Sequence, residues 1–146
     1  FKFINKRTVK FTLELFICIT IGYLFFPFAV HIFRSYFTCY TGCAVTKIVA
    51  APWFYHNRTV AVRGYLKLKF EGNVLYPLEE YYRYGFSREG IWVDINEEIK
   101  EKKNILNSKY VTITAKFNAL EHGHGDLFIG TLKEIEKVEL ITPRRD

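Results

Sequence analysis

The sequence predicts a mainly β domain, a five-stranded barrel with one internal helix, preceded by a single apolar helix near the N-terminus. Three observations support this prediction. Residues 11–33 are almost continuously apolar, residues 110–117 alternate polar and apolar side chains, and a capped helix start at Asn96 separates two groups of β-rich segments. With 146 residues, the chain has room for one domain and an anchor, but not for two globular domains.

Residues 11–34 form the predicted transmembrane helix, because about 20 apolar residues suffice to cross a bilayer. A cleaved signal peptide would have a shorter apolar region, of about 7–15 residues. The preceding flank, residues 1–10, is basic, and positive residues stay on the cytoplasmic side. We therefore expect a single-pass protein of the inner (cytoplasmic) membrane, with its N-terminus inside and its C-terminal domain in the periplasm.

Glu14 lies about one helical turn inside this predicted span, where an ionised carboxylate is costly. It either reaches back toward water beside Lys10 or contacts a polar group on a neighbouring membrane subunit. Cys39 and Cys43 follow on the expected outer side, where a disulfide would persist. A bridge between these two cysteines and a pair of free thiols are both open. Residues 40–43 also look like a degraded lipoprotein signal, but we expect the anchor to stay uncleaved.

The net charge of +6 is concentrated outside the predicted domain. Residues 44–141 hold fourteen Lys or Arg against thirteen Asp or Glu, so the domain itself is nearly neutral. A surface that follows phosphates needs a clear basic excess, so no nucleic-acid partner is expected. We divide the remainder of the chain into a linker with a short helix (35–51), the barrel (52–141) and a tail (142–146).

The barrel elements follow from residue patterns. Residues 59–70 are rich in β-branched and aromatic side chains and contain Gly64, where a bulge or bend is expected. The remaining expected elements, in chain order, are a short apolar run at 74–76, an irregular or helical segment at 78–86, a strand at 91–95, a helix capped by Asn96, a strand at 110–117, a glycine-rich turn at 122–126 and a final strand around 127–135.

Three strands, a helix and a two-stranded hairpin follow one another in the OB-fold, a partly open five-stranded barrel. The chain resembles extracytoplasmic OB-fold proteins of Gram-negative bacteria, many of them lipid- or helix-anchored and without assigned function. The stretches that carry the resemblance are 51–60 leading into 63–66, 90–94, 110–111, and 123–125 with Gly130 downstream. The resemblance covers about 44–138 and implies the fold, but no activity. An SH3-like barrel, which lacks only the internal helix, stays open.

Two groups of side chains are candidate sites. His122 and His124 lie two apart, so on an extended chain they would face the same way, and Asp126 could orient or ligate. The intervening glycines explain the same string as a tight hairpin, and we expect no metal and no cofactor. No hydrolase, P-loop or dinucleotide motif is present, so we predict a protein that is not an enzyme.

The second group, Tyr81, Tyr82, Arg83 and Tyr84, is the aromatic and basic mixture on which OB-folds stack bases or sugars. Tyrosine and arginine are also enriched at protein interfaces, and neighbouring glutamates dilute the basic field. We expect these four residues to contact a partner. The sequence thus favours a non-enzymatic accessory or assembly subunit whose partners are other membrane protein subunits and the lipid bilayer. The alternative is a ligand-binding module for a glycan, an oligonucleotide or a lipid headgroup.

Overall fold

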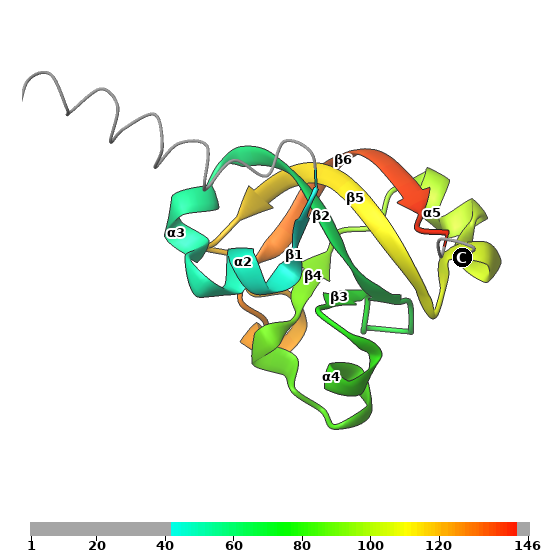
Figure 1. The fold of residues 1–146 in the computed structure, drawn as a ribbon, viewed down its shortest axis with the longest axis horizontal. Helices are drawn as coiled ribbons and strands as arrows, with labels where there is room; N and C mark the ends of the chain where they lie inside the picture. Colours follow the sequence, from blue (N-terminus) through cyan, green and yellow to red (C-terminus); the bar gives the residue numbers. More distant parts are fainter. Residues whose placement is uncertain (1–41, 143–146) are drawn as a thin grey trace, which may run out of the picture. The chain divides into compact units, whose positions relative to one another are not determined.

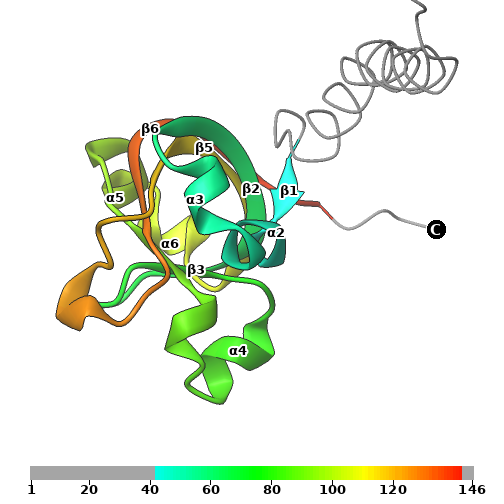
Figure 2. The same ribbon diagram turned by 90° about the vertical axis from the view of Figure 1, so that its left-hand side faces the viewer.

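The computed structural model describes residues 42–142 (Figures 1 and 2). The chain divides into two compact units, residues 1–38 and 39–146, and everything described belongs to the second. The predicted basic flank, the predicted span with Glu14, and Cys39 therefore lie outside the described residues. Within the part that is described, no helix is both long enough and apolar enough to cross a membrane.

The described residues form a mainly β domain, as predicted. The strands are β1 (Cys43–Ala44), β2 (Arg58–Lys67), β3 (Val74–Tyr76), β4 (Ile91–Val93), β5 (Lys109–Asn118) and β6 (Thr131–Leu140). The helices are α2 (Val45–Ala50), α3 (Pro52–Tyr55), α4 (Glu79–Arg83), α5 (Glu97–Glu101) and α6 (Lys103–Leu106), and two 3₁₀ turns are η1 (Ser87–Glu89) and η2 (His124–Asp126).

Five of the strands close into a barrel in the order β2-β3-β4-β6-β5, with β5 pairing back onto β2. All neighbours in this barrel are antiparallel except β4 and β6, which run parallel. The short β1 adds in parallel to the edge of β2. The internal helix lies between the third and fourth barrel strands, so the arrangement is consistent with the predicted OB-like fold.

Alternation along β5 shows why these residues form a barrel wall. Val111, Ile113, Ala115 and Phe117 are completely buried inside, and each polar residue between them is only half-buried on the outside. This is the period of two predicted for residues 110–117. Because a shift of one residue would turn all four side chains toward water, this alternation also fixes the register of β5 against β2 and β6.

Helices lie at opposite ends of the barrel, α2 and α3 at one end and α5 at the other (Figure 1). The predicted cap is present, since the side chain of Asn96 accepts a hydrogen bond from the amide of Ile99 at 3.0 Å. Ile99 and Leu106 point into the core, one from each of the two short helices α5 and α6. The predicted single helix is divided at Lys102, whose φ of −89° and ψ of 9° depart from helical values.

The final strand starts later than expected, at Thr131 instead of around residue 127. Asp126 has a positive φ of 58°, which interrupts any extended conformation there. Phe128 then packs against side chains outside the barrel instead of joining the sheet. Residues 119–130, here named the β5–β6 loop, therefore form a long folded connection instead of a tight hairpin.

At Gly64 the strand that pairs with one edge of β2 changes from β1 to β3. On one edge of β2, the pairing with β1 ends at Arg63 and the pairing with β3 begins at Tyr65. A Cβ atom on Gly64 would lie 2.8 Å from Cγ2 of Val45 and even closer to the carbonyl oxygen of Tyr76. We expected Gly64 to allow a bend, and in the structure its missing side chain lets β2, β3 and α2 pack closely together.

We predict that Gly64→Ala destabilises the protein by about 1–3 kcal/mol or more, because the carbonyl of Tyr76 is backbone and cannot rotate away. Urea unfolding of the full chain, followed by tyrosine fluorescence, measures this change. Gly72→Ala is the matched control, since its nearest neighbour would be 3.4 Å away, an ordinary contact. Equal stability of the two variants would contradict the packing described for Gly64.

Candidate functional site

The outer face of β3 and β4 is the part of an OB-like barrel where ligands bind, together with the loops beside it. Here that face is filled by the chain itself. Val74 and Tyr76 point outward from β3 and pack with Phe128 of the β5–β6 loop, which is only 9% exposed. Partly buried Trp92 of β4, with Tyr81 and Tyr82 of α4, packs against the same cluster. We name these six side chains the outer cluster.

The β5–β6 loop is closed by two hydrogen bonds between His122 and Phe128. The amide of Phe128 donates to the carbonyl of His122 at 3.1 Å, and Nδ1 of His122 lies 2.9 Å from the carbonyl oxygen of Phe128. Since a carbonyl oxygen only accepts, Nδ1 carries the hydrogen. Gly123 lies so close to Trp92 that a Cβ would be 2.5 Å from its ring, at a φ of 67°. Loop and strand therefore fit only with glycine at this position.

The candidate metal ligands do not come together. His122 is engaged with Phe128, whereas Nε2 of His124 lies 3.7 Å from a carboxylate oxygen of Glu71 in the β2–β3 turn. Asp126 is exposed. Left-handed glycines and the turn η2 separate these side chains, so the extended geometry assumed for histidines two apart is not present. No group of three or more potential metal ligands gathers within residues 42–142.

The ring of Tyr82 lies close to two other tyrosine rings and to two lysine side chains. Its ring centroid lies 5.9 Å from that of Tyr76 and 6.5 Å from that of Tyr65, and the ammonium groups of Lys67 and Lys69 lie 5.0 and 4.6 Å from it. Burial, and secondarily the neighbouring Tyr82, raises the pKa of Tyr76 above its ordinary value. The neutral phenol of Tyr76 thus sits in an apolar surrounding, and Tyr82 is a half-buried part of the same aromatic group.

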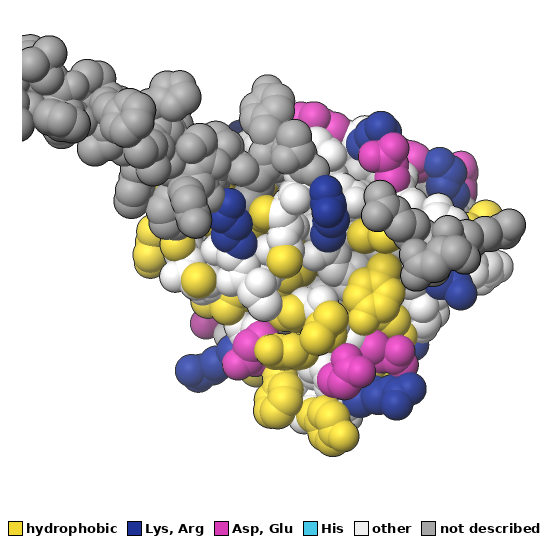
Figure 3. All heavy atoms as spheres, viewed as in Figure 1, with side chains coloured by type: hydrophobic (Ala, Val, Ile, Leu, Met, Phe, Trp, Pro, Cys, Tyr) yellow, Lys and Arg dark blue, Asp and Glu magenta, His cyan; other side chains and the backbone are white. Residues whose placement is uncertain are grey.

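Outside this cluster, α4 exposes apolar side chains. The helix buries none of its own residues. Leu78, Tyr84 and Phe86, which flank it, are 50, 74 and 51% exposed. We name these three residues with Arg83 the α4 surface, and Figure 3 shows hydrophobic side chains gathered over α4 with charged ones at their edge. Arg83 is braced by Glu79 one turn away, at 2.9 Å.

The α4 surface is held to the barrel at two places. Tyr110 of β5 accepts a hydrogen bond from the amide of Glu79 through its hydroxyl, at 3.3 Å. The rings of Tyr81 and Phe86 meet edge to face at 5.8 Å, so Phe86 rests on a residue of the outer cluster. Of the residues expected to contact a partner, Tyr84 and Arg83 are therefore exposed, whereas Tyr81 and Tyr82 are half-buried supports.

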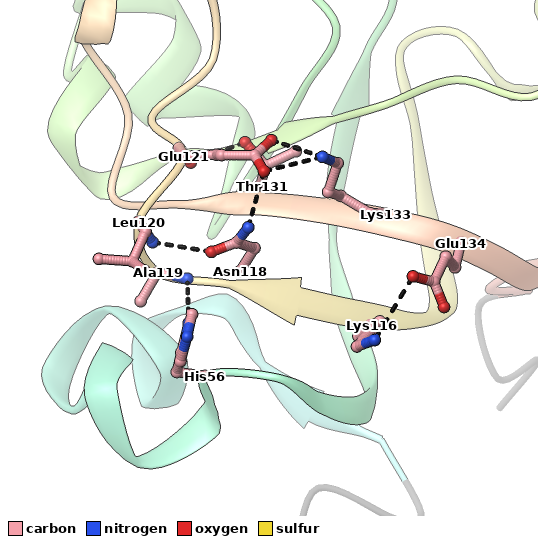
Figure 4. A network of polar contacts seen from close by, with 9 residues as sticks. All are labelled: His56, Lys116, Asn118, Ala119, Leu120, Glu121, Thr131, Lys133 and Glu134. Atoms are coloured by element: carbon pink, nitrogen blue, oxygen red, sulfur yellow. Dashed lines mark hydrogen bonds and ion pairs between the residues drawn. The ribbon is translucent and has the colours of Figure 1, made fainter.

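A polar groove crosses β4, β6 and the β5–β6 loop, with hollows of about 410 and 240 Å³ that share Asp94 and Lys133. Figure 4 shows its network. Glu121 accepts hydrogen bonds from Asn118 at 2.8 Å and from Lys133 at 2.8 Å, and its carbonyl accepts one from Thr131. The hydrogen bond from Lys133 to Glu121 raises the pKa of that ammonium group. Most charges in the groove are therefore already paired, which suits a structural role.

His56 fixes the corner between α3 and β2. Its Nδ1 accepts a hydrogen bond from the buried amide of Ala119 at 3.1 Å (Figure 4). Nε2 therefore carries the hydrogen in the neutral ring. No sequence pattern marked this bridge, because its two residues are 63 positions apart, and none marked the Glu121 network, because it forms only when the β5–β6 loop places Glu121 beside β6.

Cys43 is disulfide-bonded. The partner predicted for it, Cys39, lies outside the described residues, as does Glu14, the remaining residue expected to contact a partner. Asp94, directly after β4, is exposed.

Removing the ring of Phe128 tests how much its packing on the outer face contributes to the stability of the domain. We predict that Phe128→Ala costs about 3 kcal/mol of stability, as for other buried phenylalanines. It should also increase the acrylamide quenching of Trp92, whose ring lies 5.4 Å from that of Phe128. Leu127→Ala, at the exposed neighbouring position, is the control and should change neither property. Similar small effects of both substitutions would contradict the closure of this face by Phe128.

No family model matches the chain, and no curated protein matches it. A crystal structure described as that of a putative aspartyl-tRNA synthetase from Leishmania major Friedlin is similar in part. The two proteins share 14% sequence identity, and their superposition has a TM-score of 0.45. The matched region is 71% of this chain and 21% of the Leishmania chain. A likeness of this size is too weak to support an argument about fold or activity.

Proposed function

We propose that the protein is a membrane-anchored, non-enzymatic accessory or assembly subunit whose barrel docks on another membrane protein through the α4 surface. The observation that carries the proposal is that α4 buries none of its residues while Leu78, Tyr84 and Phe86 around it stay half or more exposed. A helix that adds no fully buried side chain to the core of the domain, and has large exposed apolar side chains around it, is typical of an interaction site.

The composition of the α4 surface supports a protein partner. Protein interfaces have an apolar centre and a polar rim, with tyrosine, phenylalanine and arginine enriched. Tyr84 and Phe86 form such a centre, and their rings lie 6.3 Å apart. The ion pair between Arg83 and Glu79 forms part of the rim.

The apolar run at 11–34 supports the membrane anchor, and the basic flank before it supports an inner-membrane location with the N-terminus inside. The disulfide at Cys43 supports a periplasmic barrel, since disulfides persist in oxidising compartments. These properties agree with an accessory subunit held beside its partner by the anchor.

The ligand-binding alternative has less support. A base or sugar ring needs an open aromatic face, and the rings best placed for stacking pack on one another in the outer cluster. The exposed rings of Tyr84 and Phe86 lie beside carboxylates on α4 instead of a continuous basic field.

We expect the double variant Tyr84→Ala/Phe86→Ala to lose the complex while keeping the fold, because both side chains are half or more exposed and the hydrogen bond from Glu79 to Tyr110 still holds α4 to the barrel. Central aromatic residues of an interface often contribute about 2 kcal/mol or more each to binding. Native electrophoresis of gently solubilised membranes measures the loss as a shift from a complex to the free chain. Ile105→Ala, at an exposed apolar position on α6, is the control. A wild-type chain that already migrates as a monomer would disprove the proposal.

A further inference from the structure

The near-neutral charge of the domain conceals a strong asymmetry along the chain. Residues 42–70 contain five basic residues and no acidic one, whereas residues 71–142 contain nine basic and thirteen acidic residues. The five basic residues are Lys47, Arg58, Arg63, Lys67 and Lys69. The first part of the domain is therefore cationic, and the excess of carboxylates lies in the remainder.

Three of these basic residues belong to one corner of the barrel. Lys47 is on α2, Arg58 opens β2 above Phe54 of α3, and Arg63 lies in the middle of β2 opposite Ala44 of β1. Helix α2 packs against β1, α3 and β2. We name these three residues together with Trp53 the basic corner. On the face seen in Figure 3, the charged side chains over β1 and β2 are basic, whereas acidic and basic side chains are mixed around α4.

Trp53 is the exposed apolar residue of this corner. It is 67% exposed, although Tyr55 in the same short helix is only 1% exposed. Phe54 between them is half-buried beneath the guanidinium of Arg58, 4.4 Å from its ring centroid. An exposed tryptophan beside basic residues is the combination found where proteins meet the headgroup region of a bilayer.

The sequence before the described residues indicates which kind of surface the basic corner meets. The predicted span ends at residue 34, and the described residues start at Gly42, so seven residues connect them. Such a connection reaches about 25 Å at most. From Gly42 the chain enters β1, α2 and α3 in succession, so the basic corner is the part of the barrel that follows the connection directly.

We propose that the basic corner rests on an anionic lipid surface, with Trp53 in the headgroup region and Lys47, Arg58 and Arg63 facing lipid phosphates. This inference rests on the membrane anchor of the proposed function. It assigns the two exposed surfaces of the domain to different partners, the basic corner to lipid and the α4 surface to protein.

The test uses the full chain reconstituted into phosphatidylcholine vesicles, with or without phosphatidylglycerol. Lipids brominated near the headgroup end of the acyl chain quench a tryptophan that reaches this depth. We expect strong quenching of wild-type fluorescence that increases with phosphatidylglycerol. Moving the indole, in the variant Trp53→Phe/Ile105→Trp, should abolish the quenching, because α6 lies at the other end of the barrel.

Charge reversal tests the electrostatic part. Lys47→Glu/Arg58→Glu should remove most of the quenching in anionic vesicles, whereas Lys103→Glu/Lys109→Glu, with the same charge change at exposed positions near α6, should not. Each basic residue near an anionic surface contributes about fivefold to membrane affinity.

The outcomes separate this inference from the proposed function. A chain that resists alkaline carbonate extraction but shows no bromine quenching would overturn the lipid contact and leave the anchor intact. A chain released by carbonate would overturn both. Shielding of Trp53 from acrylamide in native membranes, without quenching in pure lipid, would show that a protein covers the corner and would also overturn the inference.

Discussion

The packing of Phe128 on the outer face of β3 and β4 organises the surface of this domain. The ring brings the β5–β6 loop onto the barrel, where it meets Tyr76 and Trp92. Tyr82 of α4 joins the same cluster from the other side, so the insertion between β3 and β4 is also held there. One set of contacts thus closes the face that OB-folds use for ligands and fixes the helix that exposes Tyr84.

Closing this face leaves two exposed regions of different chemistry. The α4 surface offers apolar rings with a mixed-charge edge, which suits a protein interface. The basic corner offers Trp53 and three cations at the start of the domain, which suits a lipid surface. In our two proposals, a protein partner and a lipid surface would together orient the domain.

Patterns within single segments were enough to predict most of the barrel. The alternation at 110–117, the short strand at 74–76 and the cap at Asn96 each depend on neighbouring residues, and each was predicted correctly. The start of the last strand was not, because Phe128 leaves the sheet to pack on residues more than thirty-five positions away in sequence. The place of Tyr82, which we expected to contact a partner, also depends on residues distant in sequence. Its covering by Tyr65 and Tyr76 exists only after the strands pair.

The closure of the outer face by Phe128 is tested most directly by native-state hydrogen exchange. The amide of Ile129 donates to the carbonyl of Gly90 at 3.1 Å, which ties the β5–β6 loop to the start of β4. If the loop is part of the folded core, this amide exchanges only with a free energy close to that of global unfolding, whereas the amide of Tyr84 at the end of α4 exchanges by local opening. Exchange of Ile129 as fast as that of Tyr84 would mean that the loop opens and exposes β3 and β4, and would contradict this account.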